Sequence, residues 1–498
     1  MLYLRMFIMT AISLYTSRVI LQALGVIDFG LYNVVGGLVV SFTFITSSLS
    51  GASSRYITFG LGEGHFEKMK MIFGNILLMH ILLASFVVIV CETVGLWLVY
   101  NKLQIPPGRM YAALWTFHLS VVSLFINVLY APYNATIIAH EKMSAFAYIS
   151  ILDAVLKLVI VYALWVSPYD KLIIYSILLF CIHLLDMLIY YLYCRKLFLE
   201  VHTSLRFDKI FFKEIFIFAG WTFNGSLAFV GFTQGLNVLL NIFFGPAVNA
   251  ARGIAVQVQS IVMQFCTNFQ MAINPQITKS YARKDYGYMH QLLIVNSKYS
   301  FFLLLLVTLP LILEAPIVLK WWLSEVPDYT VVFLQLVICS SMLRTLANPL
   351  LVAVHATGDI KKFQLVEASL LLLIVPFAYM LLEFFHLGPA CVFVVHIVME
   401  LIAQYARIVI VLPMIGMSKQ YYFHRVALPI LKVAVISPIV PLSIKLYVGN
   451  TFLTFLLVCS VSVFSWAIIC FFLGCTQKEQ LFVKEKVQIV YSKIRARL

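Results

Sequence analysis

Several charged side chains lie deep inside long apolar stretches of this sequence. Arg344 lies near the middle of the stretch 329–357, shortly before Pro349, and no carboxylate lies three or four residues away on the same predicted helix. A charge at the centre of a membrane helix costs about 2.5–3.5 kcal/mol and therefore marks a functional position. Because a guanidinium offers paired donors that match phosphate oxygens, we expect Arg344 to face a cavity that receives an anion.

Two polar pairs also lie at depth in apolar stretches. They are Asp153 with Lys157, four residues apart, and His183 with Asp186, three residues apart. At these spacings the members of a pair share a helix face. Asp153 with Lys157 either forms a pair that neutralises itself or takes part in coupling transport to an ion.

A third polar group occupies one face of the stretch 389–413. It consists of His396, Glu400, Gln404 and Arg407. A histidine beside a carboxylate titrates in the physiological pH range, so this face is a candidate for proton or ion coupling. The candidates for coupling are therefore Asp153, Lys157, Asp186, His396 and Glu400.

Amide side chains crowd the stretch 248–278 and its neighbour 212–243. At about 100° per residue, those of 248–278 fall on two faces, and such a helix cannot expose either face to lipid. The predicted polar lining of a cavity is Asn237, Gln257, Gln264, Asn268, Gln270 and Asn274. The alternative is that some of these amides hold helices together.

The composition shows which class of protein contains these residues. The 498 residues are 62% hydrophobic and only 11% charged, with a mean hydropathy of +0.97. A soluble domain carries about 25% charged residues, so this is an all-α integral membrane protein. The nine cysteines show no metal-ligand spacing, and no GxxxxGK[ST] nucleotide loop occurs, so we expect no metal, no cofactor and no enzyme chemistry.

About fourteen stretches are long enough to cross a hydrocarbon core of about 30 Å. They are 2–24, 30–59, 71–100, 109–138, 144–166, 172–194, 212–243, 248–278, 292–320, 329–357, 363–385, 389–413, 426–447 and 452–475. Lys and Arg concentrate in the loops that follow even-numbered spans, which predicts cytoplasmic termini. The net charge of +14 is therefore a signal of topology and not of nucleic-acid binding.

The chain contains an internal repeat. Residues 127–154 run parallel to 344–371, an offset of 344 − 127 = 217, and Gly25 falls on Gly245, an offset of 245 − 25 = 220. Six spans per repeat is an even number, so the halves enter the membrane in the same direction. We expect a six-helix lobe at 1–200, a second at 212–413, two added helices at 426–475, and a basic amphipathic tail at 476–498 on the inner leaflet.

The opening of the chain resembles a known family. SLYTSRVILQALGVIDFGLYNVVGGLV (13–39) and SSRYITFGLGEG (53–64) are similar to the opening of bacterial polysaccharide flippases, which export O-antigen and capsule units and belong to the MOP (multidrug/oligosaccharidyl-lipid/polysaccharide) superfamily. These relatives carry a short polar leader before the first span, whereas this span begins almost at Met1, so a start further upstream is an open expectation.

The resemblance implies a MATE-like carrier with two lobes around a cavity that faces each side of the membrane in turn. The substrate would be an oligosaccharide on undecaprenyl pyrophosphate, moved to the periplasmic leaflet of the bacterial inner membrane by a monomer coupled to H⁺ or Na⁺. The cavity of this family is cationic, which makes Arg18, Arg55, Arg252, Lys298 and Arg344 the candidates for binding the pyrophosphate. For Arg18 and Arg252 the alternative is that they reach the outer headgroups.

Two other functions compete with this interpretation. An ion-coupled multidrug exporter of the same superfamily would share the fold, the repeat and the buried carboxylates. Its substrates are commonly cationic and would be repelled by arginines. A membrane enzyme that polymerises or ligates glycans would be expected to carry a large external loop, and every predicted external loop here is short.

Overall fold

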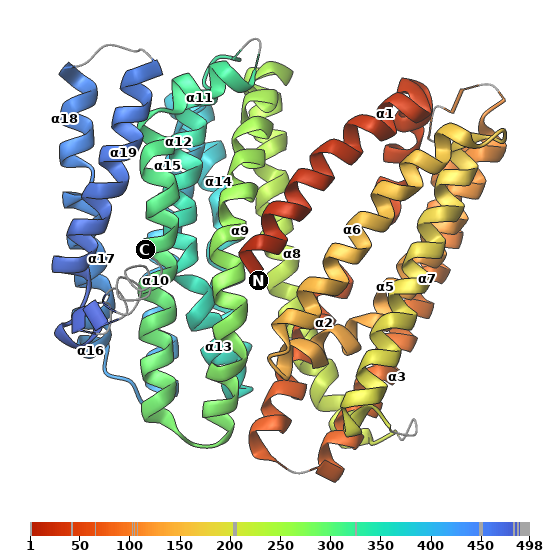
Figure 1. Ribbon diagram of the computed structural model, residues 1–498, viewed down its shortest axis with the longest axis horizontal. Coiled ribbons are helices and arrows are strands. Elements are labelled where there is room, and N and C mark those ends of the chain that lie inside the picture. Colours follow the sequence, from red (N-terminus) through yellow and green to blue (C-terminus); the bar gives the residue numbers. More distant parts are fainter. Residues whose placement is uncertain are drawn as a thin grey trace, which may run out of the picture. The chain divides into compact units, whose positions relative to one another are not determined.

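The computed structural model describes residues 2–40, 43–64, 66–101, 103, 105–106, 108–202, 207–323, 326–447, 452–481, 484–485 and 488. These residues are almost entirely helical and form no strand, so the predicted all-α class is confirmed (Figure 1). The predicted tail face of Val483, Val487, Val490 and Ile494 lies outside the described residues.

Eleven helical stretches within the described residues are long and apolar enough to cross a membrane. The other three predicted spans are also helical: 2–24 is the first part of α1 (Leu2–Val40), 30–59 covers parts of α1 and α2 (Thr43–Glu63), and 248–278 lies in α9 (Pro246–Ala282). The hydroxyl groups of α2 and the amides of α9 lower the hydropathy of those two helices.

The chain divides into two compact units, and the division falls inside two helices. The first unit comprises Met1–Leu227 and Pro275–Asp285, and the second comprises Ala228–Asn274 and Tyr286–Leu498. The helix α8 (Lys209–Phe244) therefore contributes to both units, as does α9.

The first unit is a bundle built around α5. Its central contacts join α5 to α7, α3, α2 and α1, and α6 packs on α1 and α7. Figure 1 shows α3, α5, α6 and α7 running lengthwise beside one another. The elements are α1, α2, α3 (Phe66–Val90), η1 (Cys91–Gly95), α4 (Leu96–Asn101), α5 (Met110–Ala139), α6 (Met143–Val166), α7 (Lys171–Leu197) and η2 (Leu199–Val201).

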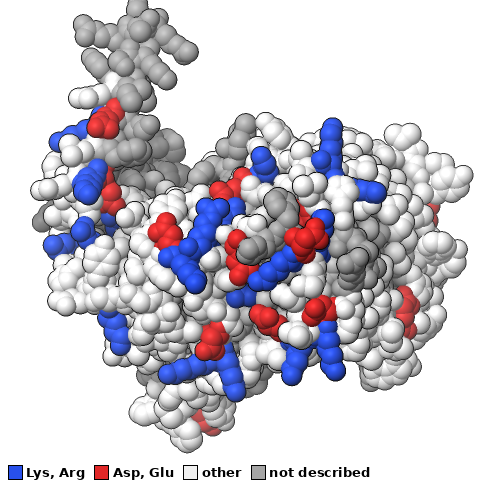
Figure 2. Space-filling model, turned by 90° about the horizontal axis from the view of Figure 1, so that it is seen from below, with Lys and Arg blue, Asp and Glu red and all other residues white. Residues whose placement is uncertain are grey.

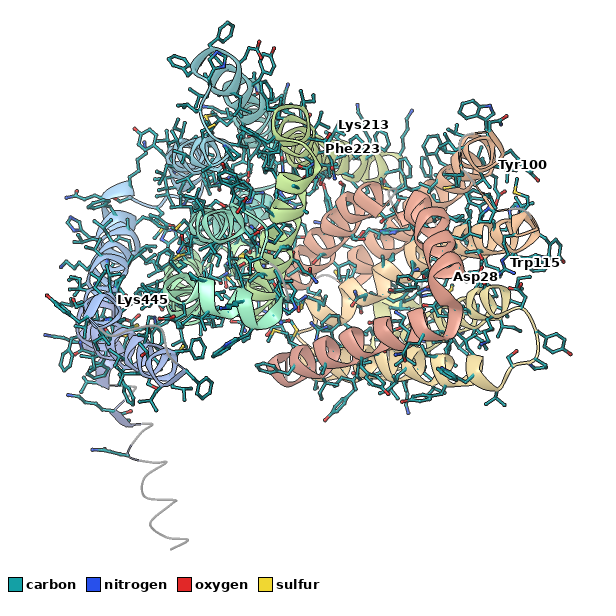
Figure 3. All side chains as sticks on the ribbon, turned by 90° about the horizontal axis from the view of Figure 1, so that it is seen from above. Asp28, Tyr100, Trp115, Lys213, Phe223 and Lys445 are labelled. Atoms are coloured by element: carbon teal, nitrogen blue, oxygen red, sulfur yellow. The ribbon has the colours of Figure 1, made fainter. Side chains whose placement is uncertain are left out.

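The second unit has α12, α14 and α15 at its centre. Its elements are α10 (Tyr286–Leu313), α11 (Ala315–Trp322), α12 (Thr330–Thr345), α13 (Ala347–Thr357), α14 (Lys361–Phe385), α15 (Cys391–Met414), α16 (Lys419–Tyr422), η3 (Phe423–Ala427), α17 (Leu428–Ile436), α18 (Ile439–Tyr447), α19 (Phe452–Ile469) and η4 (Cys470–Gly474). The last helices pack on α10, where Lys445 of α18 (Figure 3) lies 3.2 Å from the buried Glu314 carboxylate.

The two glycines of the repeat sit at equivalent bends. Gly25 has φ 78° and ψ 168°, which lies outside the helical region, so α1 consists of two helices that meet there. Gly245 has φ 79° and separates α8 from α9. Only glycine adopts such a conformation without strain.

The two prolines of the repeat also play the same part. Pro132 in α5 has no N–H, so the carbonyl of Val128 loses its helical partner. The Nδ1 atom of His80 lies 2.9 Å from that oxygen, within hydrogen-bonding distance. Pro349 in α13 likewise frees the carbonyl of Thr345, which accepts a hydrogen bond of 3.0 Å from Gln270. This second opening divides the predicted span 329–357 into α12 and α13.

Exposed aromatic side chains lie near the ends of several helices in each unit, and those that follow form two groups. In the first unit they are Trp97, Tyr100, Tyr111, Trp115, Trp165 and Tyr169, and in the second Trp321, Trp322 and Tyr447. Tyr100 and Trp115 point outward from their helices in Figure 3. Tyrosine and tryptophan prefer the membrane–water interface. Figure 2, seen from below, shows many Lys and Arg side chains interspersed with Asp and Glu.

Candidate functional site

Four charged side chains from three helices meet inside the second unit. Arg344 lies in the last turn of α12, Glu367 lies in the second turn of α14, and Glu400 and Arg407 lie two turns apart on α15. Residues seven apart on a helix share a face, and α12 and α14 both pack against α15. We call Arg344, Glu367, Glu400 and Arg407 the charge cluster.

Arg407 is the fixed member of the charge cluster. Its side chain is only 2% exposed, and its guanidinium donates to Glu400 at 2.7 Å and to Glu367 at 3.0 Å. It also donates to the Gln404 side chain at 3.2 Å. A buried arginine with this many charge-assisted bonds is locked in one geometry.

Arg344 is held loosely by the same two carboxylates. Its guanidinium lies 3.5 Å from Glu367 and 3.7 Å from Glu400, and its side chain is 32% exposed. The guanidinium carbon lies 5.2 Å from the ring centre of Phe229. The sequence had shown no partner for Arg344 on its own helix, and the partners come from α14 and α15 instead.

A third arginine and a histidine lie next to the charge cluster. Arg252 of α9 is 7% exposed and donates to the Asn237 side chain and, at 3.2 Å, to the Thr233 carbonyl. His396 interacts electrostatically with Glu400, Arg344 and Arg252, and its ring centre lies 5.2 Å from that of Phe232. Counting Arg252, which acts on His396, this part of the second unit holds three arginines and two glutamates, and its net charge is positive when His396 is neutral.

The amides of α9 divide into two sets with different roles. One set bonds to neighbouring helices within the second unit, as Gln270 does to Thr345 and as Asn274 does to Asn348 at 3.2 Å. Asn268 donates to the carbonyl of Gln264 in its own helix at 2.9 Å. The side chains of Gln257 and Gln264 are exposed. Gln270 and Asn274 therefore act as the alternative predicted, by holding helices together. Gln257 and Gln264 stay candidates for the polar lining of a cavity.

The acidic candidates of the first unit form their own cluster between α6 and α7. Lys157 lies 2.8 Å from Asp153, and Asp186 is 5% exposed. Asp186 interacts with Asp153 and Lys157, and the tyrosines Tyr130 and Tyr190 lie near both carboxylates. This places two carboxylates beside a single lysine. The structure therefore brings Asp153, Lys157 and Asp186 together, in a different unit from His396 and Glu400.

The remaining predicted cations have partners of their own. The guanidinium carbon of Arg55 lies 4.3 Å from the ring centre of Tyr56 and 4.9 Å from that of Phe59. The side chain of Arg18 lies outside the described residues. Lys298 is 1% exposed and pairs at 2.6 Å with Glu479, which follows the last helix of the second unit. Its charge is therefore balanced by the chain itself.

Glu479 is held by more than this lysine. It accepts hydrogen bonds from the backbone N–H of Thr476 at 2.6 Å and from the Thr476 hydroxyl at 2.9 Å. Burial works to raise the pKa of the Glu479 carboxyl, but the bonds from Lys298 and Thr476 outweigh it and hold the pKa below its usual range. No spacing pattern relates residues 181 positions apart, so the sequence did not indicate this pair.

Sequence analysis also missed an ionic clamp at the aromatic end of the first unit. Arg109, just before α5, donates to Asp28 of α1 at 2.8 Å and to Asp170, which caps α7. Asp28 is labelled in Figure 3. Burial alone would raise the pKa of Asp170. Its bonds from Arg109 and from the backbone of Ile173 and Leu172 instead keep the pKa low. The only signal in the sequence was that Arg109 is one of the few basic residues in the loops that follow odd-numbered spans.

Within the described residues, no cluster of three or more His, Cys, Asp or Glu side chains could hold a metal ion.

Comparison with known sequences gives no match, either to a protein-family model or to a curated protein. Solved structures do match. The MATE multidrug transporter DinF-BH is 17% identical, with a TM-score of 0.69 over 83% of this chain and 94% of that one. An outward-facing MATE multidrug resistance transporter of the MOP superfamily is 15% identical, with a TM-score of 0.68 over 83% and 94%.

A MOP superfamily transporter from Pyrococcus furiosus is also similar. It is 14% identical, with a TM-score of 0.66 over 83% of this chain and 94% of that one, and it is described as having a binding pocket of reverse polarity that suggests a different function. At these identities the likeness is one of fold. The chain has the fold of MOP superfamily transporters, and it is a multi-pass membrane protein.

Proposed function

We propose that this protein is a flippase that moves oligosaccharide linked to undecaprenyl pyrophosphate from the cytoplasmic to the periplasmic leaflet by alternating access. The observation that carries the proposal is the charge cluster with its neighbour Arg252. Arginines outnumber carboxylates there, and Arg344 is the one that is partly exposed and loosely paired. A diphosphate supplies the oxygens that such a guanidinium lacks.

The polar surroundings fit the glycan part of the substrate. The exposed amides Gln257 and Gln264 on α9 offer donors and acceptors for sugar hydroxyls. Of the five cations named as candidates, Arg344 and Arg252 form the core of the proposed site. Lys298 and Arg55 are set aside because Glu479 and aromatic rings already engage them.

The transporter fold is compatible with this proposal but does not identify the substrate. DinF-BH and the outward-facing MATE protein are described as multidrug transporters. The P. furiosus protein is described as having a binding pocket of reverse polarity that suggests a different function. The cationic second unit favours an anionic substrate.

A second candidate is an ion-coupled multidrug exporter. The observation in its favour is the first unit, where Asp153 and Asp186 lie together with a single lysine and would suit a cation. Under the flippase proposal, the same carboxylates serve as a site for the coupling H⁺ or Na⁺.

Two assays separate these candidates. The full-length protein is expressed in a panel of bacterial strains that lack their own flippase and make different lipid-linked glycans, and surface polysaccharide is measured. In parallel, it is expressed in a strain without drug exporters, and efflux of the cationic dye ethidium is measured. We expect surface polysaccharide to be restored in at least one strain, with no efflux of ethidium. Efflux of ethidium without any restored polysaccharide would establish the exporter instead.

A further inference from the structure

The two arginines of the charge cluster share the same two carboxylates but hold them unequally. We infer that Arg344 is an exchangeable counter-ion of Glu400, and that its departure toward a substrate anion is balanced by the uptake of one proton on Glu400. Arg407 is a positioning residue that keeps both carboxylates in place meanwhile. This inference rests on the proposed function, because it takes the substrate anion as the group that draws Arg344 away.

The distances separate the roles of the two arginines. Arg407 bonds Glu400 at 2.7 Å and Glu367 at 3.0 Å from a site that is 2% exposed. Arg344 approaches the same groups only to 3.5 and 3.7 Å, and it is 32% exposed. A long contact from a partly exposed side chain is lost at much smaller cost than a short contact inside the protein.

The charge balance requires a compensating ion once Arg344 leaves. With both arginines present, two positive charges face two negative charges and the cluster is neutral. Without Arg344, the two carboxylates keep only Arg407 as a bonded guanidinium. Arg252 does not replace Arg344, because it is bonded to Asn237 and to the Thr233 carbonyl and acts on His396. Keeping two neighbouring carboxylates ionised in one buried site costs free energy, because the like charges repel each other. The pair therefore binds one proton.

The proton belongs on Glu400 and not on Glu367. The Glu400 side chain is 0% exposed, whereas that of Glu367 is 11% exposed and lies beside a small pocket between α14 and α15. The Oε2 atom of Glu400 is buried and has no hydrogen-bond partner, and it is the atom that faces Arg344 at 3.7 Å. Loss of Arg344 therefore leaves this oxygen with no compensating charge.

Other titratable groups surround Glu400 and bear on this balance. His396 acts on Glu400 from the preceding turn of α15 and is itself repelled by Arg252 and Arg344. It is the main rival as a proton acceptor. Of the elements packed on α15, α12 supplies Arg344 and α14 supplies Glu367, and the charges that act on Glu400 are those of Arg407, Arg344 and His396.

The experiment detects the protonated carboxyl directly. The infrared C=O stretch of a carboxylic acid is measured on the purified full-length protein at neutral pH for the wild type, Arg344→Gln, Arg344→Lys, and Arg344→Gln combined with Glu400→Gln. Arg344→Gln imitates departure of the arginine. We expect it to gain about one protonated carboxyl relative to the wild type. Arg344→Lys keeps the charge and should gain none, and the double variant should lose the gain.

A second measurement uses the unmodified protein, in case Arg344→Gln folds poorly. Farnesyl pyrophosphate serves as a probe with an isoprenoid diphosphate, and its binding should produce the same band in the wild type and not in Glu400→Gln. Its affinity should fall by up to about tenfold per pH unit as the pH rises.

The outcomes separate the inference from the function on which it rests. The inference is overturned if folded Arg344→Gln gains no carboxyl band, if the band survives Glu400→Gln, or if a titrating His396 takes the proton instead. Binding of farnesyl pyrophosphate without the band overturns it as well. Failure of the wild type to bind the probe would contradict the proposed substrate, whereas the band in Arg344→Gln would still decide the inference.

Discussion

At the scale of single residues, burial distinguishes side chains that look alike in the sequence. Arg344 and Arg407 both lie in apolar stretches, yet one is 32% exposed and the other 2%. The predicted face of His396, Glu400, Gln404 and Arg407 does gather its residues, because helical spacing is enough to align them. For Arg344, the sequence offered Asp153, Asp186, Glu367 and Glu400 as possible partners on other helices. Spacing could not choose among them, because tertiary packing brings Glu367 and Glu400 to Arg344.

The two arginines should therefore respond differently to replacement. Arg407→Gln leaves Glu400 and Glu367 buried without their main counter-ion, and we expect a loss of about 3–5 kcal/mol in stability. Arg344→Gln removes only long, partly exposed contacts and should cost about 1 kcal/mol or less. Thermal unfolding of the two detergent-purified variants against wild type provides the measurement. Equal losses would contradict the assignment of Arg407 as the fixed member of the charge cluster.

The ionic clamp of Arg109 should make stability depend on acid pH. The pKa of Asp170 is lowered in the folded protein, so its contribution is fully present above the unfolded pKa of about 4 and is lost as the pH falls through the folded pKa. Asp170→Asn should therefore unfold at a lower temperature than the wild type at neutral pH. In acid, the unfolding temperatures of the two proteins should lie closer together. Asp328→Asn, at an exposed loop position, is the matched control. If the difference in unfolding temperature between Asp170→Asn and the wild type did not change with pH, the Asp170 carboxylate would not stabilise the fold through its charge.

At the scale of elements, the repeat shows itself in backbone geometry. Gly25 and Gly245 have φ values of 78° and 79°, and Pro132 and Pro349 each free a carbonyl that a side chain from another helix satisfies. The offsets in the sequence predicted these correspondences, because glycine and proline dictate the backbone directly. The satisfying side chains, His80 and Gln270, are not repeat-related, so no offset could have indicated them.

Gly25 should be sensitive to a methyl group for reasons of backbone alone. A Cβ at this position would meet no atom within 4 Å, but φ 78° with ψ 168° belongs to a region that only glycine populates. Gly25→Ala should therefore cost about 1–3 kcal/mol. The control is Gly220→Ala, a helical position in α8 where a Cβ also meets nothing, and where alanine should gain up to about 1 kcal/mol. Opposite shifts in thermal stability are expected, and equal shifts would contradict the role of the bend.

At the scale of the whole molecule, composition was enough to predict an all-α membrane protein, and the opening of the chain pointed to the MOP superfamily whose fold the structure shares. Eleven of the fourteen predicted spans match helical stretches of the described residues that are long and apolar enough to cross a membrane. The six-helix lobes at 1–200 and 212–413 stay a prediction. The compact units of the structure divide within α8 and α9, since packing groups residues by contact and not by order along the chain.

The predicted topology can be tested with reporter fusions. Basic loops predict that both termini are cytoplasmic, so green fluorescent protein fused after Leu498 should fluoresce. Alkaline phosphatase fused after Leu387, in the loop between α14 and α15, should be active because that loop is expected to face the periplasm. A dark C-terminal fusion together with an inactive phosphatase fusion would invert the topology and the proposed direction of transport.

Export by variants of Arg344 shows whether this arginine meets the diphosphate during transport. In a strain whose surface polysaccharide the wild type restores, glycan reaching the periplasmic face is measured at matched protein level for Arg344→Ala, Arg344→Lys and the exposed control Arg283→Ala. We expect Arg344→Ala to abolish export, Arg344→Lys to restore it only in part because the paired donors are lost, and Arg283→Ala to export normally. Wild-type export by Arg344→Ala would contradict the account, since the diphosphate would then cross without the arginine assigned to meet it.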